Sequence, residues 1–266
     1  MTIFELHIFG MTLAPTYYGL MYAIGFMAGY QIIKNRGVIP FERMDNLFMY
    51  IFLGVVLGGR FGYILFYNLS TYLSNPIDII KFWEGGMSFH GGVIGVLLAM
   101  YLFSRKYKIN FLVLADQVTL ILPIGIGLGR IGNYLNKELL GFSPYNGILA
   151  VEKNGISYFP SPLLEALLEG LVLYIILLFF YKRMIKGNTS YNNSFNEKYN
   201  AGQIGALFLI FYAIFRLFVE VFFRLPDSQI GYIFGYFTMG ELLTLPMLII
   251  GLILYFRFNK NLGTTN

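Results

Sequence analysis

Seven long apolar segments dominate this chain of 266 residues and restrict how it can fold. A helix needs ~20 mostly apolar residues to cross the hydrocarbon core of a bilayer. Hydrophobic residues make up 57% of the chain and charged residues only 12%, whereas soluble domains carry ~25% charged residues. We therefore expect an all-α integral membrane protein with about seven transmembrane helices. The expected spans are Tyr17–Ile33, Leu47–Tyr67, Met87–Phe103, Leu112–Ile131, Pro162–Tyr181, Gly202–Phe222 and Phe234–Phe256.

Successive loops alternate between many and few basic residues. The loops after the first, third and fifth spans, together with the C-terminal tail, hold most of them: Lys34, Arg36, Arg43, Arg105, Lys106, Lys108, Lys182, Arg183, Lys186, Lys198, Arg257 and Lys260. Cytoplasmic loops carry the excess of lysine and arginine, so the N-terminus is predicted outside and the C-terminus in the cytoplasm. The net charge of +5 is thereby accounted for without a nucleic-acid partner.

The spans and loops together predict a single polytopic membrane domain over residues 1–266. Two stretches between spans, around 67–86 and 139–160, are too irregular to cross the membrane. Both follow spans that end on the predicted outer side. We expect them to form a small extracytoplasmic cap over the helix bundle.

Charged side chains within the spans gather in the outer halves. Such residues are costly in a bilayer and are usually functional or paired with one another. Snorkelling or structural pairing explains any single one of them, but a one-sided set of eight or nine favours function. Asp116, near the inner start of the fourth span, is the main exception. The set comprises Arg60, His90, Arg130, Glu165, Glu169, Arg216, Glu220, Arg224 and Glu241.

Helical spacing places several of these side chains on shared faces. Arg216, Glu220 and Arg224 follow one another at intervals of four residues, so Glu220 is expected between two guanidiniums. Arg130 and Asn133 also share a face, since they are three residues apart. Three arginines facing one cavity repel unless an anion joins them, and the arginine fork suits phosphate oxygens. The pattern indicates an anionic, amphiphilic ligand reached from the outer leaflet, such as a phospholipid headgroup.

Two glycine-rich motifs carry more specific information. They read GGMSFHGGVIG over residues 85–95 and GRIGNYLNKELLG over residues 129–141. Supporting stretches are YGLMY at 18–22, LGGRFGY at 57–63, FRLFVE at 215–220 followed by Arg224, and Met239 with Gly240. Together they resemble the prolipoprotein diacylglyceryl transferase family, in the expected order along nearly the whole chain.

One stretch departs from the family pattern. Members commonly read His-Pro-Ser-Gln-Leu-Tyr-Glu at the start of the fifth span, whereas this chain reads FPSPLLE over residues 159–165. The tyrosine and glutamine are therefore absent, together with any role they have in the family. The glutamate of the pattern is retained as Glu165.

The resemblance implies a transferase of the bacterial cytoplasmic (inner) membrane. Its substrates would be phosphatidylglycerol and the lipobox region that follows the signal peptide of a prolipoprotein. The lipobox cysteine would displace glycerol phosphate and take the diacylglyceryl group as a thioether, the first step of lipoprotein maturation. No metal or organic cofactor is implied. The absence of cysteine from this chain agrees, because the reactive thiol comes from the partner.

The family motifs also suggest roles for individual side chains. Arg130 and Arg216 would bind the phosphate and stabilise its departure, and His90 would act as general base or polarise the glycerol phosphate. Tyr18 would lie near the reacting centre and belongs with the catalytic set. The remaining candidates for phosphatidylglycerol binding are Asn133, Asn136, Glu138, Gly141, Tyr212, Glu220, Arg224 and Arg60. Structural alternatives remain: His90 bonded to a backbone carbonyl, Glu138 and Glu220 as partners of arginine, and glycines that permit helix packing.

Two other classes of function stay open. An anion or lipid transporter would need a charged path through the whole membrane, and the inner halves of most spans are nearly free of charge. A non-catalytic membrane protein that only binds phospholipid is the other alternative. Mere lipid binding does not require the whole set of histidine, arginine and asparagine side chains. Release of glycerol phosphate that depends on a lipobox cysteine separates the enzyme from both alternatives.

Overall fold

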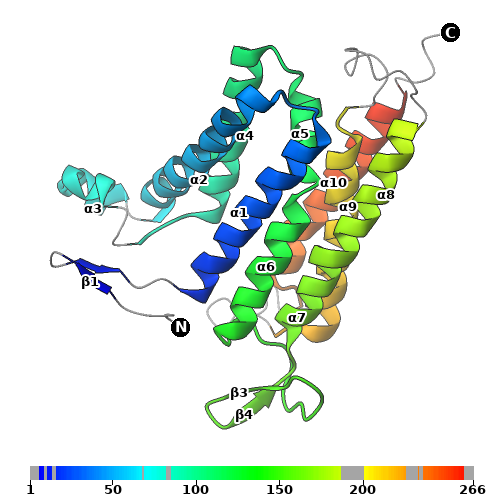
Figure 1. The fold of residues 1–266 in the computed structure, drawn as a ribbon. Helices are drawn as coiled ribbons and strands as arrows, with labels where there is room; N and C mark the ends of the chain where they lie inside the picture. The colour runs from blue at the N-terminus through cyan, green and yellow to red at the C-terminus, as the bar shows by residue number, and fades with distance from the viewer. Residues whose placement is uncertain are drawn as a thin grey trace. The chain divides into compact units, whose positions relative to one another are not determined.

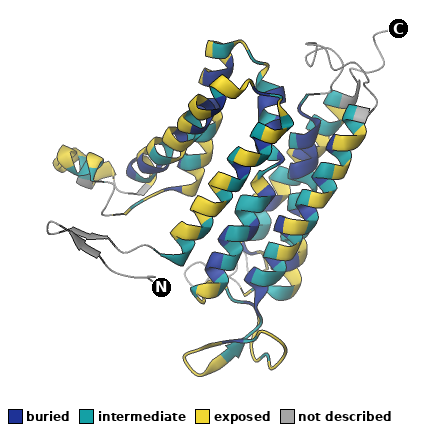
Figure 2. Ribbon diagram, viewed as in Figure 1, coloured by how far each residue is buried: buried dark blue, intermediate teal, exposed yellow. Residues whose placement is uncertain are grey.

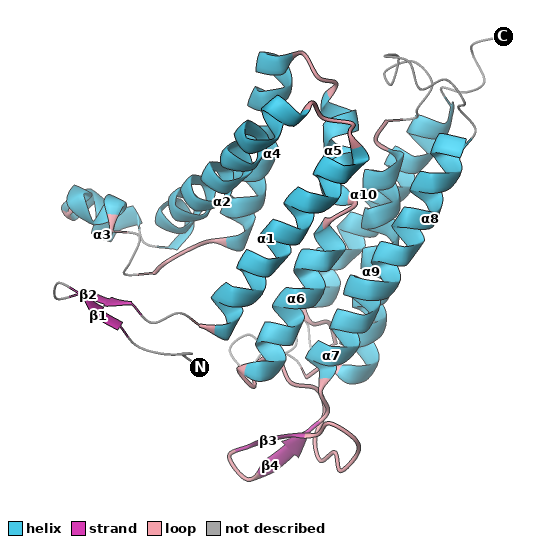
Figure 3. Cartoon of the chain, viewed as in Figure 1, coloured by secondary structure: helices cyan, strands magenta, loops and turns pink. Residues whose placement is uncertain are grey.

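The structure is a computed structural model that describes residues 6–8, 11–13, 16–67, 69–81, 85–186, 201–225, 233 and 236–260. These residues are mostly helical, and two short antiparallel strand pairs accompany the helices (Figures 1 and 3). The predicted all-α class is confirmed in this main feature.

Every predicted span overlaps helix in the described part of the chain; Phe234, the predicted start of the seventh span, lies outside the described residues. Short helices η1 (Phe41–Arg43), α3 (Leu69–Ser74) and η2 (Pro76–Ile80) lie between the longer ones. The other helical segments are α1 (Tyr17–Arg36), α2 (Met44–Tyr67), α4 (Phe89–Tyr107), α5 (Phe111–Thr119), α6 (Leu122–Leu135), α7 (Ser161–Glu165), the π-helical turn η4 (Ala166–Val172), α8 (Leu173–Lys186), α9 (Gln203–Phe223) and α10 (Met239–Lys260).

Five helical stretches in the described part of the chain are long and apolar enough to cross a membrane. They are Phe41–Phe66, Phe111–Leu135, Ser161–Ile185, Gln203–Phe223 and Met239–Phe258. The protein is therefore a multi-pass membrane protein. Helices α1 and α4 occupy predicted positions but do not join these five, since both end in basic turns and carry several glycines. Seven spans, like the orientation of the termini, stay a prediction.

Many residues along the helices are exposed, as the yellow parts of the ribbon in Figure 2 show, and many of these exposed residues are large and apolar. Along η4 and α8, Leu167, Leu171, Ile175 and Phe179 repeat every four residues and are 48%, 55%, 55% and 59% exposed. One helix face thus presents a continuous apolar stripe. Large exposed apolar surfaces of this kind mark contact with a membrane.

The chain forms two compact units, which are described separately. One contains Met1–Ile32 and Asp116–Asn266, and the other contains Ile33–Ala115. The first unit therefore holds α1 and α6 to α10, and the second holds α2, α3 and α4. The single domain over residues 1–266 stays a prediction.

Glycines bring α2 and α4 together in the unit of residues 33–115. Gly54, Gly58 and Gly62 follow one another every four residues on α2. A Cβ at Gly62 would stand 2.6 Å from Cα of Gly91, and one at Gly54 would stand 2.7 Å from the carbonyl oxygen of Gly95. The two backbones thus approach as closely as small residues allow. The structural interpretation of Gly91 is confirmed, which accounts for part of the motif at 85–95.

The larger unit packs its helices around a hydrophobic core. The buried core residues are Leu120, Leu173, Leu177, Tyr181, Ile204, Leu207 and Phe208. A second close approach joins α6 to η4, where a Cβ at Gly170 would stand 2.8 Å from Cα of Gly127. Helix α1 belongs to the same unit, and a Cβ at Gly25 would stand 3.4 Å from Cα of Gly125. Helix α6 is thereby held from two sides.

Asp116 has a structural explanation. Its side chain is fully buried and accepts hydrogen bonds from the backbone N–H groups of Gly202 (2.7 Å) and Gly205 (2.9 Å). These groups lie at the start of α9, whose own N-cap residue, Gly202, has no side chain to serve them. Asp116 therefore caps α9 from α5, since the first N–H groups of a helix need outside acceptors.

Replacing Asp116 with alanine is expected to lower the free energy of unfolding by about 2 kcal/mol, because buried N–H groups lose a charged acceptor. Thermal unfolding in detergent should show a lower midpoint than wild type. The exposed carboxylate of Glu42 provides the matched control, Glu42→Gln, which should unfold like wild type. An unchanged midpoint for Asp116→Ala would exclude this capping role.

The segment predicted as a cap at 139–160 contains a β-hairpin. Strand β3 (Val151–Lys153) pairs antiparallel with β4 (Ile156–Tyr158), with Val151 opposite Tyr158. Asn154 and Gly155 join the strands, and both have positive φ (52° and 75°), the requirement of a tight hairpin turn. A second hairpin, β1 (Leu6–Ile8) with β2 (Met11–Leu13), precedes α1 and was not predicted. The other predicted cap region contains α3 and η2.

Candidate active site

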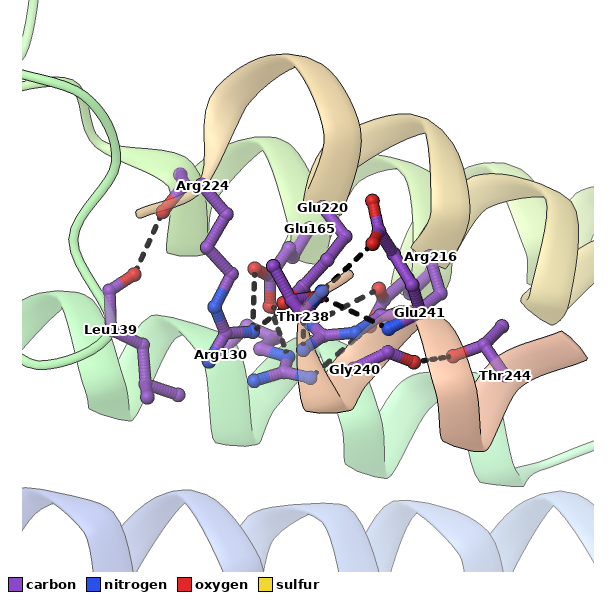
Figure 4. A network of polar contacts seen from close by, with 12 residues as sticks. Arg130, Leu139, Glu165, Arg216, Glu220, Arg224, Thr238, Gly240, Glu241 and Thr244 are labelled. Atoms are coloured by element: carbon purple, nitrogen blue, oxygen red, sulfur yellow. Dashed lines mark hydrogen bonds and ion pairs between the residues drawn. The ribbon is translucent and has the colours of Figure 1, made fainter. Parts of the chain in front are cut away.

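Six charged side chains from four helical elements meet in the larger unit, and Figure 4 labels all of them except Glu169. The arginines are Arg130 from α6, Arg216 from α9, and Arg224 at the C-cap of α9. The carboxylates are Glu165 at the end of α7, Glu169 from η4, and Glu220 from α9. We refer to these six residues as the charge cluster. Its arginines were predicted to act together, and the structure brings them together.

Glu165 contacts all three arginines of the charge cluster. Its Oε2 lies 2.7 Å from Nε of Arg130 and 3.1 Å from Nη1 of Arg216. Its Oε1 accepts a hydrogen bond from Nη1 of Arg224 at 3.3 Å. The Glu165 side chain is fully buried, whereas those of Arg130, Arg216 and Arg224 are 16%, 12% and 13% exposed. The carboxylate is thus buried, whereas each arginine side chain keeps a small exposed fraction.

Glu169 adds a second buried carboxylate one turn further along the chain. Its Oε2 lies 3.4 Å from Nη2 of Arg130, and its Oε1 lies 3.8 Å from Nη1 of Arg216. Glu169 belongs to the π-helical turn η4, a conformation that is rare and frequent at functional sites. Because this wider turn follows Glu165 directly, Glu165 and Glu169 both point at the same arginines.

Glu220 lies between Arg216 and Arg224, as predicted from the spacing. Its Oε2 is 2.8 Å from Nη2 of Arg216 and 3.7 Å from Nη1 of Arg224. A Cβ at Gly240 would stand 2.6 Å from the carboxyl carbon of Glu220. The glycine of the Met239–Gly240 motif therefore leaves room for this carboxylate beside the start of α10.

Glu241 has a local structural role. Its Oε2 accepts a hydrogen bond from the backbone N–H of Thr238 (2.8 Å), and its own N–H donates to Oγ1 of Thr238 (3.1 Å). This reciprocal pair is a capping box at the start of α10. Thr244 Oγ1 donates to the carbonyl oxygen of Gly240 in the next turn (2.6 Å).

The motif at 129–141 ends in a turn that reaches the charge cluster. Asn133 is buried, and its Nδ2 donates to Oε2 of Glu138 at 3.1 Å, so Glu138 pairs with an amide and not with an arginine. Asn136 forms the C-cap of α6. Gly141 pairs in antiparallel fashion with Arg224, and a Cβ there would stand 3.0 Å from the carbonyl oxygen of Phe159. The structure therefore explains Gly141 by close backbone approach.

Two predicted tyrosines belong to the same unit. The hydroxyl of Tyr18 lies 2.7 Å from that of Tyr22, and a Cβ at Gly132 would stand 2.9 Å from Cδ2 of Tyr18. Tyr18 thus packs against the helix that carries Arg130. Tyr212 precedes Arg216 by one turn of α9, and its ring stacks on that of Phe208.

His90 and Arg60 lie in the other unit, so their positions relative to the charge cluster stay a prediction. His90 is exposed in the first turn of α4, where the N-cap residue Ser88 accepts from the N–H of Gly91 (3.2 Å). Arg60 is buried and donates to the carbonyl oxygens of Ile79, Asp78, Gly85 and Gly86. These contacts give Arg60 a structural role, since they connect residues 78–79 with residues 85–86 ahead of α4.

The charge cluster corrects one step of the sequence argument. Repulsion among three arginines was taken to require an external anion, but three glutamates already supply three negative charges. Glu165 and Glu169 were named among the charged residues of the spans, but they were not predicted as partners of these arginines. Their spacing at the start of the fifth span signals a shared face, but it does not name the arginines of other helices that they meet.

Comparison with known proteins gives consistent results. Residues 6–257 match the family described as prolipoprotein diacylglyceryl transferase. A relative named phosphatidylglycerol–prolipoprotein diacylglyceryl transferase, from Hydrogenovibrio crunogenus, is 45% identical over 248 residues, or 88% of this chain and 86% of the relative. Relatives with the same name from Rickettsia felis (44% over 246 residues, 90% of each chain) and Geobacter sulfurreducens (44% over 244 residues, 89% and 88%) are similarly close.

Proposed function

The chain belongs to the prolipoprotein diacylglyceryl transferase family, and on that premise we propose that it transfers the diacylglyceryl group of phosphatidylglycerol to a prolipoprotein cysteine. The thiolate sulfur of the lipobox cysteine attacks the glycerol carbon that bears the phosphate. A carbon–sulfur bond forms, the carbon–oxygen bond to phosphate breaks, and glycerol phosphate leaves with the electron pair. The thiol proton passes to a base.

The charge cluster is the observation that supports this chemistry best. Arg130 and Arg216 come from different helices, yet both contact Oε2 of Glu165, so their guanidiniums are held at fixed positions. Each keeps a partly exposed side chain. Preorganised donors of this kind stabilise charge that develops on a leaving group. We assign the phosphate to Arg130 and Arg216, with Arg224 as a further partner.

The remaining roles follow the family motifs. His90 acts as general base for the thiol, because free cysteine has a pKa of about 8.5 and must lose its proton to react. Tyr18 and Tyr212 line the reacting centre. Asn133, Asn136, Glu138 and Gly141 shape the headgroup site at the end of α6. Arg60 supports the loop that precedes His90 through its backbone contacts.

The proposed topology follows from the substrates. We propose seven spans in the bacterial cytoplasmic membrane, with the N-terminus outside and the outer half of the bundle facing both substrates. Phosphatidylglycerol and the signal peptide each lie in the bilayer, and the lipobox cysteine of an exported prolipoprotein stands at its outer surface. The segment with the β3–β4 hairpin then lies on the outer side.

The transporter alternative finds less support. Asp116, the main charged residue within the spans on the predicted inner side, is engaged in capping α9. The arginines and glutamates of the charge cluster neutralise one another, so they do not form a charged path through the membrane. A passive phospholipid-binding protein fits the arginines but gives no use to a histidine base.

A paired peptide assay tests the proposal. Membranes that contain the protein are incubated with phosphatidylglycerol and a lipobox peptide carrying either cysteine or serine at the acceptor position. Glycerol phosphate release with the cysteine peptide alone supports the transferase. Equal release with both peptides indicates a phospholipase, and no release with either excludes the proposed reaction.

A further inference from the structure

The Glu165 carboxylate stands at the centre of the charge cluster (Figure 4). It is the one carboxylate among the described ion pairs that contacts Arg130, Arg216 and Arg224 together. Glu169 contacts the first two, and Glu220 contacts the last two. The spacing of the three guanidiniums therefore depends on Glu165 more than on either neighbour.

Several contacts fix Glu165 in place. Helix α7 begins at Ser161, whose buried hydroxyl donates to the carbonyl oxygen of Leu139 at 2.7 Å. Pro162 occupies the first turn of α7, where its fixed φ suits the start of a helix. On the other side of Glu165, Gly170 packs its backbone against Gly127 of α6. Glu165 is thus presented by a short segment that is anchored at both ends.

The charge balance of the cluster indicates a second role for Glu165. With all six groups ionised, three guanidiniums and three carboxylates leave the charge cluster formally neutral. A phosphate that binds there competes with carboxylates for the same N–H donors. The product, glycerol phosphate, carries more negative charge than the phosphodiester of the lipid. Without a competing carboxylate, the arginines would hold this product more firmly than the substrate.

We infer that Glu165 is a positioning residue that sets the spacing of the phosphate-binding arginines and competes with glycerol phosphate for them, which promotes release of the product. This inference rests on the proposed function. Glu165 touches no reacting atom. Its side chain acts through Arg130, Arg216 and Arg224.

Two substitutions separate the two parts of this role. Glu165→Gln keeps the shape and removes the charge, so turnover should fall about 100-fold. The dissociation constant of glycerol phosphate should fall about tenfold, because the net charge of the cluster becomes more positive by one. Glu165→Asp keeps the charge and shortens the side chain by one methylene, so turnover should fall while that dissociation constant stays unchanged. Glu42→Gln, at an exposed carboxylate of the other unit, is the matched control.

The measurements are the turnover number with a lipobox peptide and the affinity of glycerol phosphate by calorimetry in detergent. A purely structural role lowers both together. Unchanged or weaker binding of glycerol phosphate by folded Glu165→Gln overturns the competition, and normal turnover by Glu165→Asp overturns the positioning. If Glu165→Gln does not fold, the aspartate variant still decides the positioning role. Absence of transfer by the wild-type protein would refute the proposed function. Comparing glycerol phosphate binding by wild type and Glu165→Gln would still test whether Glu165 competes for the arginines.

Discussion

Replacing Arg130 with alanine is expected to lower the turnover of diacylglyceryl transfer by about 1000-fold, because removing one preorganised donor typically costs 100- to 1000-fold. Arg130 pairs with both Glu165 and Glu169, and its side chain is partly exposed. We expect a similar loss for Arg216→Ala, since Arg216 contacts the same two carboxylates and Glu220. The measurement is the initial rate of thioether formation at saturating phosphatidylglycerol.

Stability must be separated from catalysis in these variants. Loss of Arg130 leaves buried carboxylates with fewer partners, and breaking a buried ion pair costs about 3–5 kcal/mol. Arg130→Lys keeps the charge but lacks the planar fork, so it should fold better than the alanine variant and still transfer poorly. Arg105→Ala removes an exposed cation of α4 and serves as control. Near-normal turnover by Arg130→Lys or Arg130→Ala at wild-type protein levels would show that Arg130 does not bind the phosphate.

Replacing His90 with glutamine should lower turnover at neutral pH by about 100-fold, the lower end of what a general base contributes. His90 is exposed in the first turn of α4, so the substitution should leave the unfolding midpoint unchanged. The loss should shrink as the pH rises above ~8.5, because the cysteine thiol then ionises without a base. Rates over a range of pH, with the same peptide, measure this recovery.

A structural His90 would behave differently. Turnover would then remain near normal at neutral pH, or it would fall by the same factor at every pH. Phe89→Leu is the matched control, since Phe89 is exposed and stacks edge-on against the His90 ring without any titratable group. Either of the two outcomes for His90→Gln, with Phe89→Leu active, would remove His90 as the base.

Helix positions could be predicted because apolar length is a local property. Each predicted span overlaps helix, including α1 and α4, whose hydropathy is lower. The break between α5 and α6 has a local signal in Pro123, which stands in the first turn of α6. The π-helical turn η4 was not predicted, and it lies where Gly127 and Gly170 bring α6 and η4 together. The Asn154–Gly155 turn was missed despite a local signal, because the segment was treated as irregular.

The charge cluster shows where local reasoning ends. Glu220 could be placed between Arg216 and Arg224 because all three residues share one helix. Glu165 and Glu169 could not be paired with Arg130, because the spacing within one helix does not reveal which face of another helix it meets. The same limit applies to Asp116, whose partners lie 86 and 89 residues away.

The nature of the bond that forms tests the central claim most directly. The purified protein is incubated with vesicles of phosphatidylglycerol and a lipobox peptide. The mass of the peptide is measured by mass spectrometry before and after treatment with neutral hydroxylamine, which cleaves thioesters and leaves oxygen esters and thioethers intact. Attack at the glycerol carbon predicts a gain of one diacylglyceryl group that resists hydroxylamine, with one glycerol phosphate released per peptide. A gain of a single acyl group that hydroxylamine removes, or an unmodified peptide, would contradict diacylglyceryl transfer by this protein.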